Sequence, residues 1–129
     1  MLFTCPARRI LRALHAGQTP QTWRYHYRHA RLLGPLAALR AFHASELPFL
    51  FGTHTLGGYI PTSADEEVVD TLQGRWSAFA ARHDPNVDGG VAWPQYIMAQ
   101  DNTAVLEDPV SITMGVATDH CDFWDNLVP

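Results

Sequence analysis

Residues 64–83 constrain the fold most, because their apolar residues recur at helical spacing over several turns. The residues that share one helical face are Val69, Leu72, Trp76, Phe79 and Ala80. A stripe of this kind is buried when the helix packs against other elements. The pattern therefore predicts a long amphipathic helix that covers a hydrophobic core.

Both ends of this helix carry sequence signals. Ser63 and Glu66 have the spacing of a capping box, in which each side chain accepts a hydrogen bond from the other residue's backbone. At the other end, Pro85 stands between Asp84 and Asn86, and proline cannot continue a helix. We therefore expect the helix to begin at Ala64, with Ser63 as its N-cap.

Shorter elements surround the long helix. Residues 4–17 predict a helix with Thr4 as its N-cap, Gly17 as its C-cap and an apolar face of Ile10, Leu11 and Leu14. Residues 119–127 predict a second short helix. Strands are expected at 22–29, 103–107 and 110–113, a turn at 18–21, a loop or loose helical segment at 30–41, and a loop at 53–61.

The strand expected at 22–29 is the most regular of the three. Trp23, Tyr25 and Tyr27 alternate with Arg24, His26 and Arg28. Successive side chains of a strand point to opposite faces, so the aromatic side chains are expected on one face and the basic ones on the other.

The charges are divided unevenly along the chain. Its 129 residues are 47% hydrophobic and 17% charged, which indicates a globular protein. Seven arginines and no acid lie in residues 1–43, whereas two arginines and all 13 acids lie in residues 44–129. The basic half is compatible with anion or nucleic-acid binding, with a targeting presequence, or with pairing against acids in the fold or in a partner.

The sequence indicates neither a membrane-spanning or signal segment nor a metal site. No apolar run reaches the roughly 18 residues that span a bilayer, and the first residues lack the apolar core of a signal peptide. His26 and His29 would point to opposite faces of a strand, and no Cys-x-x-Cys or His-Glu-x-x-His occurs. We therefore expect no structural metal and no cofactor.

Residues 42–52 read Phe-His-Ala-Ser-Glu-Leu-Pro-Phe-Leu-Phe-Gly, with one histidine ahead of an apolar run and a glutamate three positions later. This stretch resembles the histidine segment of the type B carboxylesterases, the cholinesterase-containing group of the α/β-hydrolase superfamily. Five further stretches are similar to the family in the same order along the chain. They are Phe3–Ala7, Trp23–Tyr27, His83–Asn86, Trp93–Tyr96 and Cys121–Trp124.

The resemblance implies an α/β fold, with residues 1–129 as a C-terminal fragment of an α/β-hydrolase domain: late sheet strands plus packing helices. The superfamily's nucleophile lies in a Gly-x-Ser-x-Gly elbow, which this sequence does not contain. The serine, the triad acid and the oxyanion hole are therefore expected in a missing N-terminal part of the same fold. Ala44 and Ser45 also depart from the family, whose members often carry glycine and an aromatic residue there.

The resemblance assigns His43 as the general base of the triad. Imidazole suits this role because its unperturbed pKa is about 6.5. Glu46 is expected to anchor the loop, paired with Arg40 or Arg24, rather than to act as the triad acid. Phe42 is expected either to line the acyl pocket or to pack in the core.

Cys5 and Cys121 occupy positions where many secreted relatives carry a disulfide. The resemblance therefore implies a Cys5–Cys121 bond and an oxidising, extracellular location for the parent protein.

Two functions remain open on the sequence. The chain is expected to be the histidine-bearing segment of a secreted serine carboxylesterase acting on small-molecule or lipid esters, and to be inactive alone. The alternative is a non-catalytic, cholinesterase-like binding or adhesion protein, because some family members have lost the triad. No nucleic-acid partner is expected for either.

Overall fold

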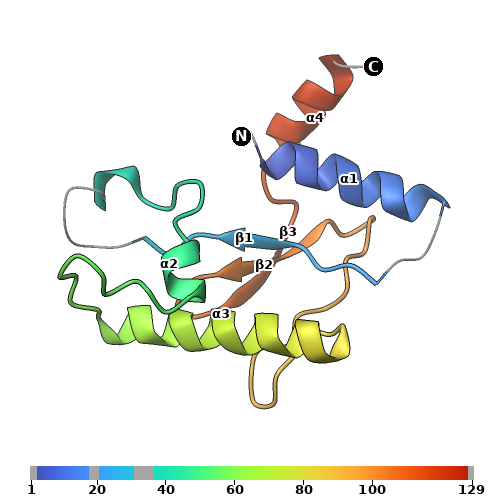
Figure 1. Cartoon of the computed structure of the whole chain (residues 1–129). Coiled ribbons are helices and arrows are strands. Elements are labelled where there is room, and N and C mark those ends of the chain that lie inside the picture. The colour runs from blue at the N-terminus through green and yellow to red at the C-terminus, as the bar shows by residue number, and fades with distance from the viewer. Residues whose placement is uncertain (1–2, 18–20, 31–36, 128–129) are drawn as a thin grey trace. The chain divides into compact units, whose positions relative to one another are not determined.

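The computed structural model describes residues 3–17, 21–30 and 37–127. The elements in chain order are α1 (Thr4–Gly17), β1 (Tyr25–Tyr27), the 3₁₀ turn η1 (Ala37–Leu39), α2 (Leu47–Leu50), α3 (Ser63–Arg82), β2 (Asn102–Leu106), β3 (Ser111–Met114) and α4 (Thr118–Leu127). These are the mixed helices and strands of an α/β chain, as Figure 1 shows.

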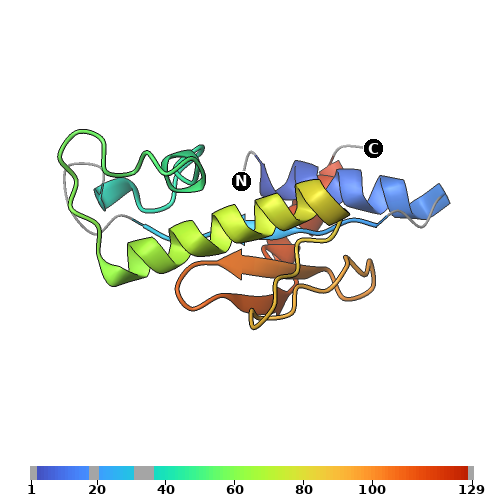
Figure 2. The ribbon, with the colours of Figure 1, turned by 60° about the horizontal axis from the view of Figure 1, so that its bottom comes forward.

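The strands form one sheet in the order β1-β2-β3. Ala104 N–H donates to the Arg24 carbonyl at 2.9 Å, and Arg28 N–H donates to the Leu106 carbonyl at 3.1 Å. These hydrogen bonds advance in the same direction along both strands, which is the pattern of a parallel pair, so β1 and β2 are parallel. β2 and β3 lie side by side and are joined by a short turn, as Figure 2 shows.

The chain groups into two compact units. Unit 1 contains Met1–His26, Pro94–Ala104 and Ile112–Pro129, and unit 2 contains Tyr27–Trp93 and Val105–Ser111. In unit 1, α1 lies against α4. In unit 2, α2 lies against α3, as can be followed in Figure 1. Each unit is described below by itself.

Most predicted elements are confirmed to within a few residues. The helices expected at 4–17 and 119–127 correspond to α1 and α4, and the strands expected at 103–107 and 110–113 correspond to β2 and β3. The loop expected at 53–61 contains turns and no regular element. Residues 18–20 of the expected turn and residues 31–36 of the expected loop lie outside the described residues.

The predicted start of α3 was wrong by one residue. The N-cap is Thr62, whose extended backbone has φ −89° and ψ 169°, and whose hydroxyl accepts from the Asp65 N–H at 3.2 Å. The Asp65 carboxylate accepts in return from the Thr62 N–H at 2.7 Å. Threonine and aspartate thus form the box expected from Ser63 and Glu66, because Asp65 is the acid that faces inward.

The buried face of α3 also differs from the predicted stripe. Its buried residues are Asp65, Val68, Val69, Leu72, Arg75 and Ala78. Phe79 is 48% exposed, and Ala80 is exposed as well. The predicted stripe includes apolar residues alone. The helix also buries Asp65 and Arg75, so its buried face is rotated relative to the predicted one.

Two other predictions of which face of an element is buried are also wrong. The strand expected at 22–29 is regular only over Tyr25–Tyr27, and Arg24 is buried while Tyr25 is 41% exposed. On α1, the expected apolar residues Ile10 and Leu14 are 61% and 42% exposed. The buried residues of α1 are instead Cys5 and Arg8.

Candidate functional site

His43 lies in a tight turn that leads into α2. The turn is closed by hydrogen bonds from Ser45 N–H to the Phe42 carbonyl at 3.0 Å and from Leu47 N–H to the Ala44 carbonyl at 3.2 Å. Ala44 adopts a left-handed conformation with φ 65°. His43 is exposed at this reversal of the backbone. Phe42 is 42% exposed and is not a core residue.

Glu46 is half-buried and caps α2 through its backbone, with no capping hydrogen bond from its side chain. Of its two expected partners, Arg24 is paired with Asp101 instead. Among the described residues, the ion pairs of the structure do not include Glu46 with Arg40. Pairing of Glu46 with either predicted arginine therefore does not anchor this turn.

Phe49 provides that anchor. Within residues 41–53, all of which the structure describes, Phe49 is the one buried residue, with 1% of its surface exposed. Its ring meets the His29 ring edge to face at 5.3 Å and stacks on the His54 ring at 5.4 Å with an interplanar angle of 12°. Tyr27 closes the cluster with a centroid distance of 6.3 Å.

Asp65 collects hydrogen bonds from three segments of unit 2. His29 Nε2 lies 2.7 Å from one carboxylate oxygen, and the Tyr59 hydroxyl donates to the other at 2.8 Å. The Thr62 N–H and hydroxyl donate to that second oxygen at 2.7 and 2.8 Å. Burial alone raises the pKa of Asp65, but the hydrogen bonds from His29, Thr62 and Tyr59 outweigh it and lower the pKa to about 2.

The sequence gives no reason to pair His29 with Asp65. Asp65 is one of three consecutive acids at the start of the long helix, and His29 stands out only by its spacing from His26. The available signal was the Thr62–Asp65 spacing, which is a capping box as good as Ser63–Glu66. Within the described ranges, no group of three or more His, Cys, Asp or Glu side chains is arranged to hold a metal ion.

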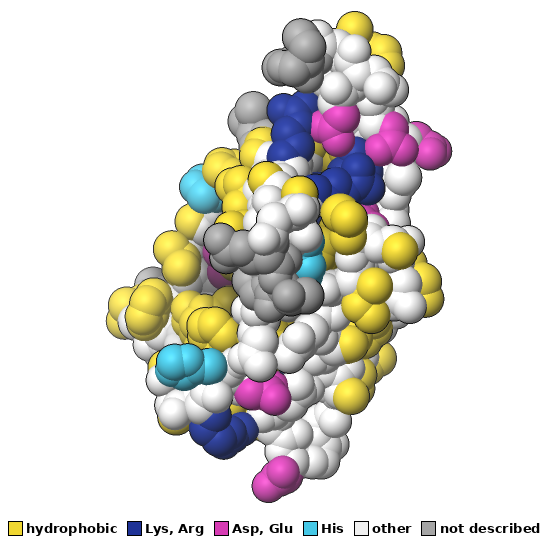
Figure 3. Space-filling view, turned by 90° about the vertical axis from the view of Figure 1, so that its right-hand side faces the viewer, with side chains coloured by type: hydrophobic (Ala, Val, Ile, Leu, Met, Phe, Trp, Pro, Cys, Tyr) yellow, Lys and Arg dark blue, Asp and Glu magenta, His cyan; other side chains and the backbone are white. Residues whose placement is uncertain are grey.

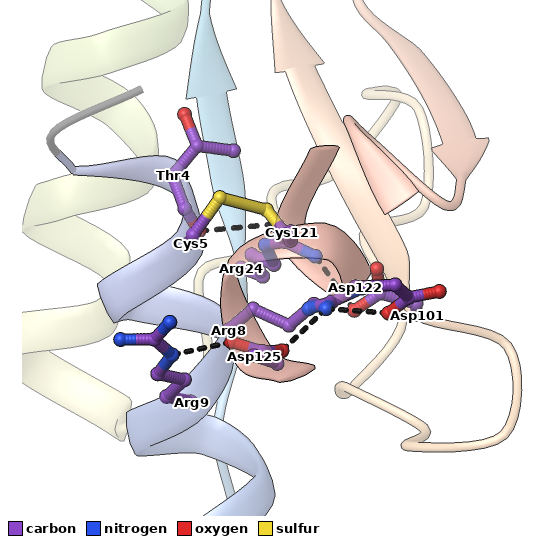
Figure 4. The surroundings of a disulfide bond; sticks show 9 residues. All are labelled: Thr4, Cys5, Arg8, Arg9, Arg24, Asp101, Cys121, Asp122 and Asp125. Carbon is purple, nitrogen blue, oxygen red and sulfur yellow. Dashed lines mark hydrogen bonds and ion pairs between the residues drawn. A yellow bond between two sulfur atoms is a disulfide. The ribbon is translucent and has the colours of Figure 1, made fainter. Parts of the chain in front are cut away.

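In unit 1, a disulfide joins Cys5 on α1 to Cys121 on α4, with their Cα atoms 5.2 Å apart (Figure 4). The fully buried Arg8 donates to Asp122 at 2.7 Å and also binds Asp125, which in turn binds Arg9. Figure 3 shows arginine and acidic side chains next to one another on the part of the surface where α1 and α4 lie. The covalent bond and the ion pairs fasten the same two helices.

These ion pairs also bear on the uneven charge distribution. Arg8, Arg9 and Arg24 each pair with an acid from the other half of the sequence. Arg28 lies 3.9 Å from Glu107. The contacts favour the third interpretation of the basic half, in which it pairs with acids of the same fold.

Unit 2 has a cleft of about 190 Å³ beside α3. Its lining includes Arg75, Glu67, Val91 and Glu107. Arg75 is buried, donates to the Val91 carbonyl at 2.6 Å and lies over the Trp93 ring at 5.7 Å. Burial lowers the pKa of Arg75. His43 is not among the residues that line this cleft.

A sequence profile described as the carboxylesterase family matches residues 1–124. The chain belongs to the carboxylesterase family. Cocaine esterase from Oryctolagus cuniculus is 26% identical over 99% of this chain and 24% of its own length. Para-nitrobenzyl esterase from Bacillus subtilis strain 168 is 35% identical over 57% of this chain and 16% of its own length.

Solved structures of this carboxylesterase family share the fold. A thermophilic PNB esterase superimposes with a TM-score of 0.68 and 25% identity, covering 78% of this chain and 21% of that one. Another PNB esterase structure gives a TM-score of 0.64 and 31% identity, covering 76% of this chain and 20% of the esterase. The chain thus has the C-terminal part of a carboxylesterase α/β-hydrolase fold and spans about a quarter or less of its relatives' length.

The described ranges contain no helix suited to span a membrane. Of the helices within 3–17 and 37–127, none combines the length and apolar character that a bilayer crossing requires.

Proposed function

We propose that this chain supplies the general base of a serine carboxylesterase, and that His43 is that base. The observation that carries the proposal is the exposed position of His43, on a turn braced by hydrogen bonds, in a chain of the carboxylesterase family. Two relatives named as esterases, cocaine esterase and para-nitrobenzyl esterase, support ester hydrolysis as the reaction.

The chemistry assigned to His43 is proton transfer. One ring nitrogen takes the proton of the serine hydroxyl as that oxygen attacks the ester carbonyl, and later returns it to the leaving alcohol. The other ring nitrogen donates to a carboxylate that fixes the tautomer. This sequence has no Gly-x-Ser-x-Gly elbow, so the serine, the acid and the oxyanion hole would come from a complementary N-terminal part of the fold.

The same proposal includes the part of the esterase domain that this chain forms, the class of substrate and the location of the protein. Residues 1–129 form the C-terminal part of the esterase domain, and the substrates are small-molecule or lipid carboxylic esters, with Phe42 near the acyl group. The Cys5–Cys121 disulfide supports an extracellular location, since such bonds persist in oxidising compartments.

A second candidate function is a cholinesterase-like binding or adhesion protein without catalysis. Some members of the family keep the fold but have lost the triad, which makes this function the alternative to catalysis. The two candidates differ in what they require of His43, because a binding protein does not need a general base at that position.

A chimera of the Bacillus subtilis para-nitrobenzyl esterase distinguishes them. This chain replaces the matching segment, and hydrolysis of a p-nitrophenyl ester is measured with and without His43→Ala. As a general base, His43 is expected to contribute a factor on the order of 10⁴ or more to kcat. His83→Ala, at the exposed end of α3, is the matched control and should retain activity. A folded His43→Ala chimera with the parent's activity would refute the proposed base.

A further inference from the structure

We propose that Asp65, acting through His29 and Phe49, positions the turn that carries His43. This inference rests on the proposed function, because it concerns the placement of the proposed base. It assigns Asp65 and His29 as positioning residues rather than catalytic ones, since neither is assigned a contact with a substrate.

The turn and α2 move as one piece. Backbone hydrogen bonds follow one another from the Phe42 carbonyl, which accepts from Ser45, to Thr53, whose N–H donates to the Pro48 carbonyl at 2.7 Å. The Leu50 N–H donates to the Glu46 carbonyl at 2.9 Å between them. A segment tied at such short intervals changes its direction only as a unit.

This piece has one buried side chain among residues 41–53. Phe49 is buried, whereas Leu47 on α2 and the C-cap residue Phe51 are 41% and 70% exposed. The orientation of the segment therefore depends mainly on the site that holds the Phe49 ring. His29 forms the edge-on wall of that site, and His54 forms its stacked wall.

Asp65 fixes the position of the His29 ring. The His29–Asp65 contact of 2.7 Å joins two side chains that are 10% and 2% exposed, so water competes weakly for it. Asp65 is itself held by Tyr59 and by the backbone of Thr62 at the N-terminus of α3. The imidazole of His29 consequently has one orientation relative to α3, and Phe49 packs against that orientation.

Separate variants test the two parts of this relay. His29→Gln retains a donor that can reach Asp65 but removes the aromatic wall. His29→Phe retains an aromatic wall but removes the donor. Asp65→Asn retains one acceptor oxygen, which can serve Tyr59 and Thr62, but removes the charge and the second acceptor, which faces His29. Asn86→Ala is the matched control, because it breaks the paired hydrogen bonds between Asn86 and the Trp93 backbone in the same unit without touching Phe49.

The first measurement is native-state hydrogen exchange on the 129-residue chain. The His29 and Asp65 variants should speed exchange of the amides at 47–53 at least about tenfold, while the amides of Tyr96 and Ala104 in unit 1 keep their rates. Asn86→Ala should leave 47–53 unchanged. Unaltered exchange at 47–53 in both His29 variants would refute the relay. If Asp65→Asn prevents folding, the milder His29→Gln variant decides the outcome.

The second measurement uses the esterase chimera and separates positioning from stability. Variants that loosen residues 47–53 should lower kcat about tenfold while KM stays within about twofold, because a misplaced base slows proton transfer without weakening substrate binding. Asn86→Ala should keep the parent's kcat. Loosened variants with an unchanged kcat would refute the positioning role. Failure of the proposed function is visible separately, as retained activity in His43→Ala.

Discussion

The guanidinium of Arg24 donates a hydrogen bond of 2.6 Å to the Asp101 carboxylate, across 77 positions of the sequence. Their side chains are 4% and 8% exposed. The Tyr96 hydroxyl donates to the same carboxylate oxygen at 2.8 Å. Burial and the neighbouring Asp101 both raise the pKa of Tyr96, so the phenol stays protonated and serves as a donor. This buried group organises unit 1.

Arg24→Met is therefore expected to reduce the free energy of unfolding by about 3–5 kcal/mol, because it leaves the Asp101 charge buried without its cation. Urea denaturation at pH 7 measures the change. The double variant Arg24→Met/Asp101→Asn should recover part of the loss, since it removes the orphaned charge and keeps an acceptor for Tyr96. A loss below about 1 kcal/mol in the single variant would contradict this account.

The Cys5–Cys121 bond closes a loop with a sequence separation of 116. A chain-entropy model assigns such a loop about 4–5 kcal/mol of stabilisation. Replacing both cysteines by serine should lower the urea midpoint accordingly, and a reductant should then have no further effect. Thiol counting in denatured, non-reduced protein should find none; two reactive thiols would show that the bond is absent.

The lowered pKa of Asp65 makes the free energy of unfolding depend on pH. Its pKa is lowered from 3.8 to about 2 in the folded chain, so its contribution is complete above pH 4 and is lost as the pH falls through 2. The size of this contribution is about 2 kcal/mol. Stability of the parent chain and of Asp65→Asn, measured between pH 6 and pH 2, should converge at the acid end. A constant difference across this range would contradict the assigned pKa.

Ala44 adopts φ 65°, a left-handed conformation that strains residues with a Cβ atom. Ala44→Gly should remove that strain and raise the free energy of unfolding by up to about 1 kcal/mol, after allowance for glycine's freedom in the unfolded chain. Ala44→Val should have the opposite effect. Thermal denaturation of the three proteins gives the order, and a less stable Ala44→Gly would contradict the assigned backbone conformation.

The isolated chain is expected to be inactive on esters, since its sequence holds no nucleophile elbow. Purified protein incubated with p-nitrophenyl acetate should release p-nitrophenol at the background rate. Turnover that a serine-directed organophosphate abolishes would contradict this expectation and would require a serine of this chain as the nucleophile.

The sequence by itself determined most of the local elements and identified His43 as the candidate base. These features depend only on residues that are close in the sequence, so they can be recognised without knowledge of the fold. They are the periodicity at 64–83, the prolines and glycines that end elements, and the ordered stretches that resemble the family. The Cys5–Cys121 bond also followed from the resemblance, and the structure contains it.

Only the tertiary structure decided which polar residues are inside. His29 and Asp65 are 36 positions apart, and Arg24 and Asp101 are 77 apart, so no local pattern relates them. A buried charge is tolerated when the fold brings it a partner, and the cost of burial without one is high. Pairing at long range therefore rotated the buried face of α3, turned Arg24 inward and left Glu46 without the expected arginine.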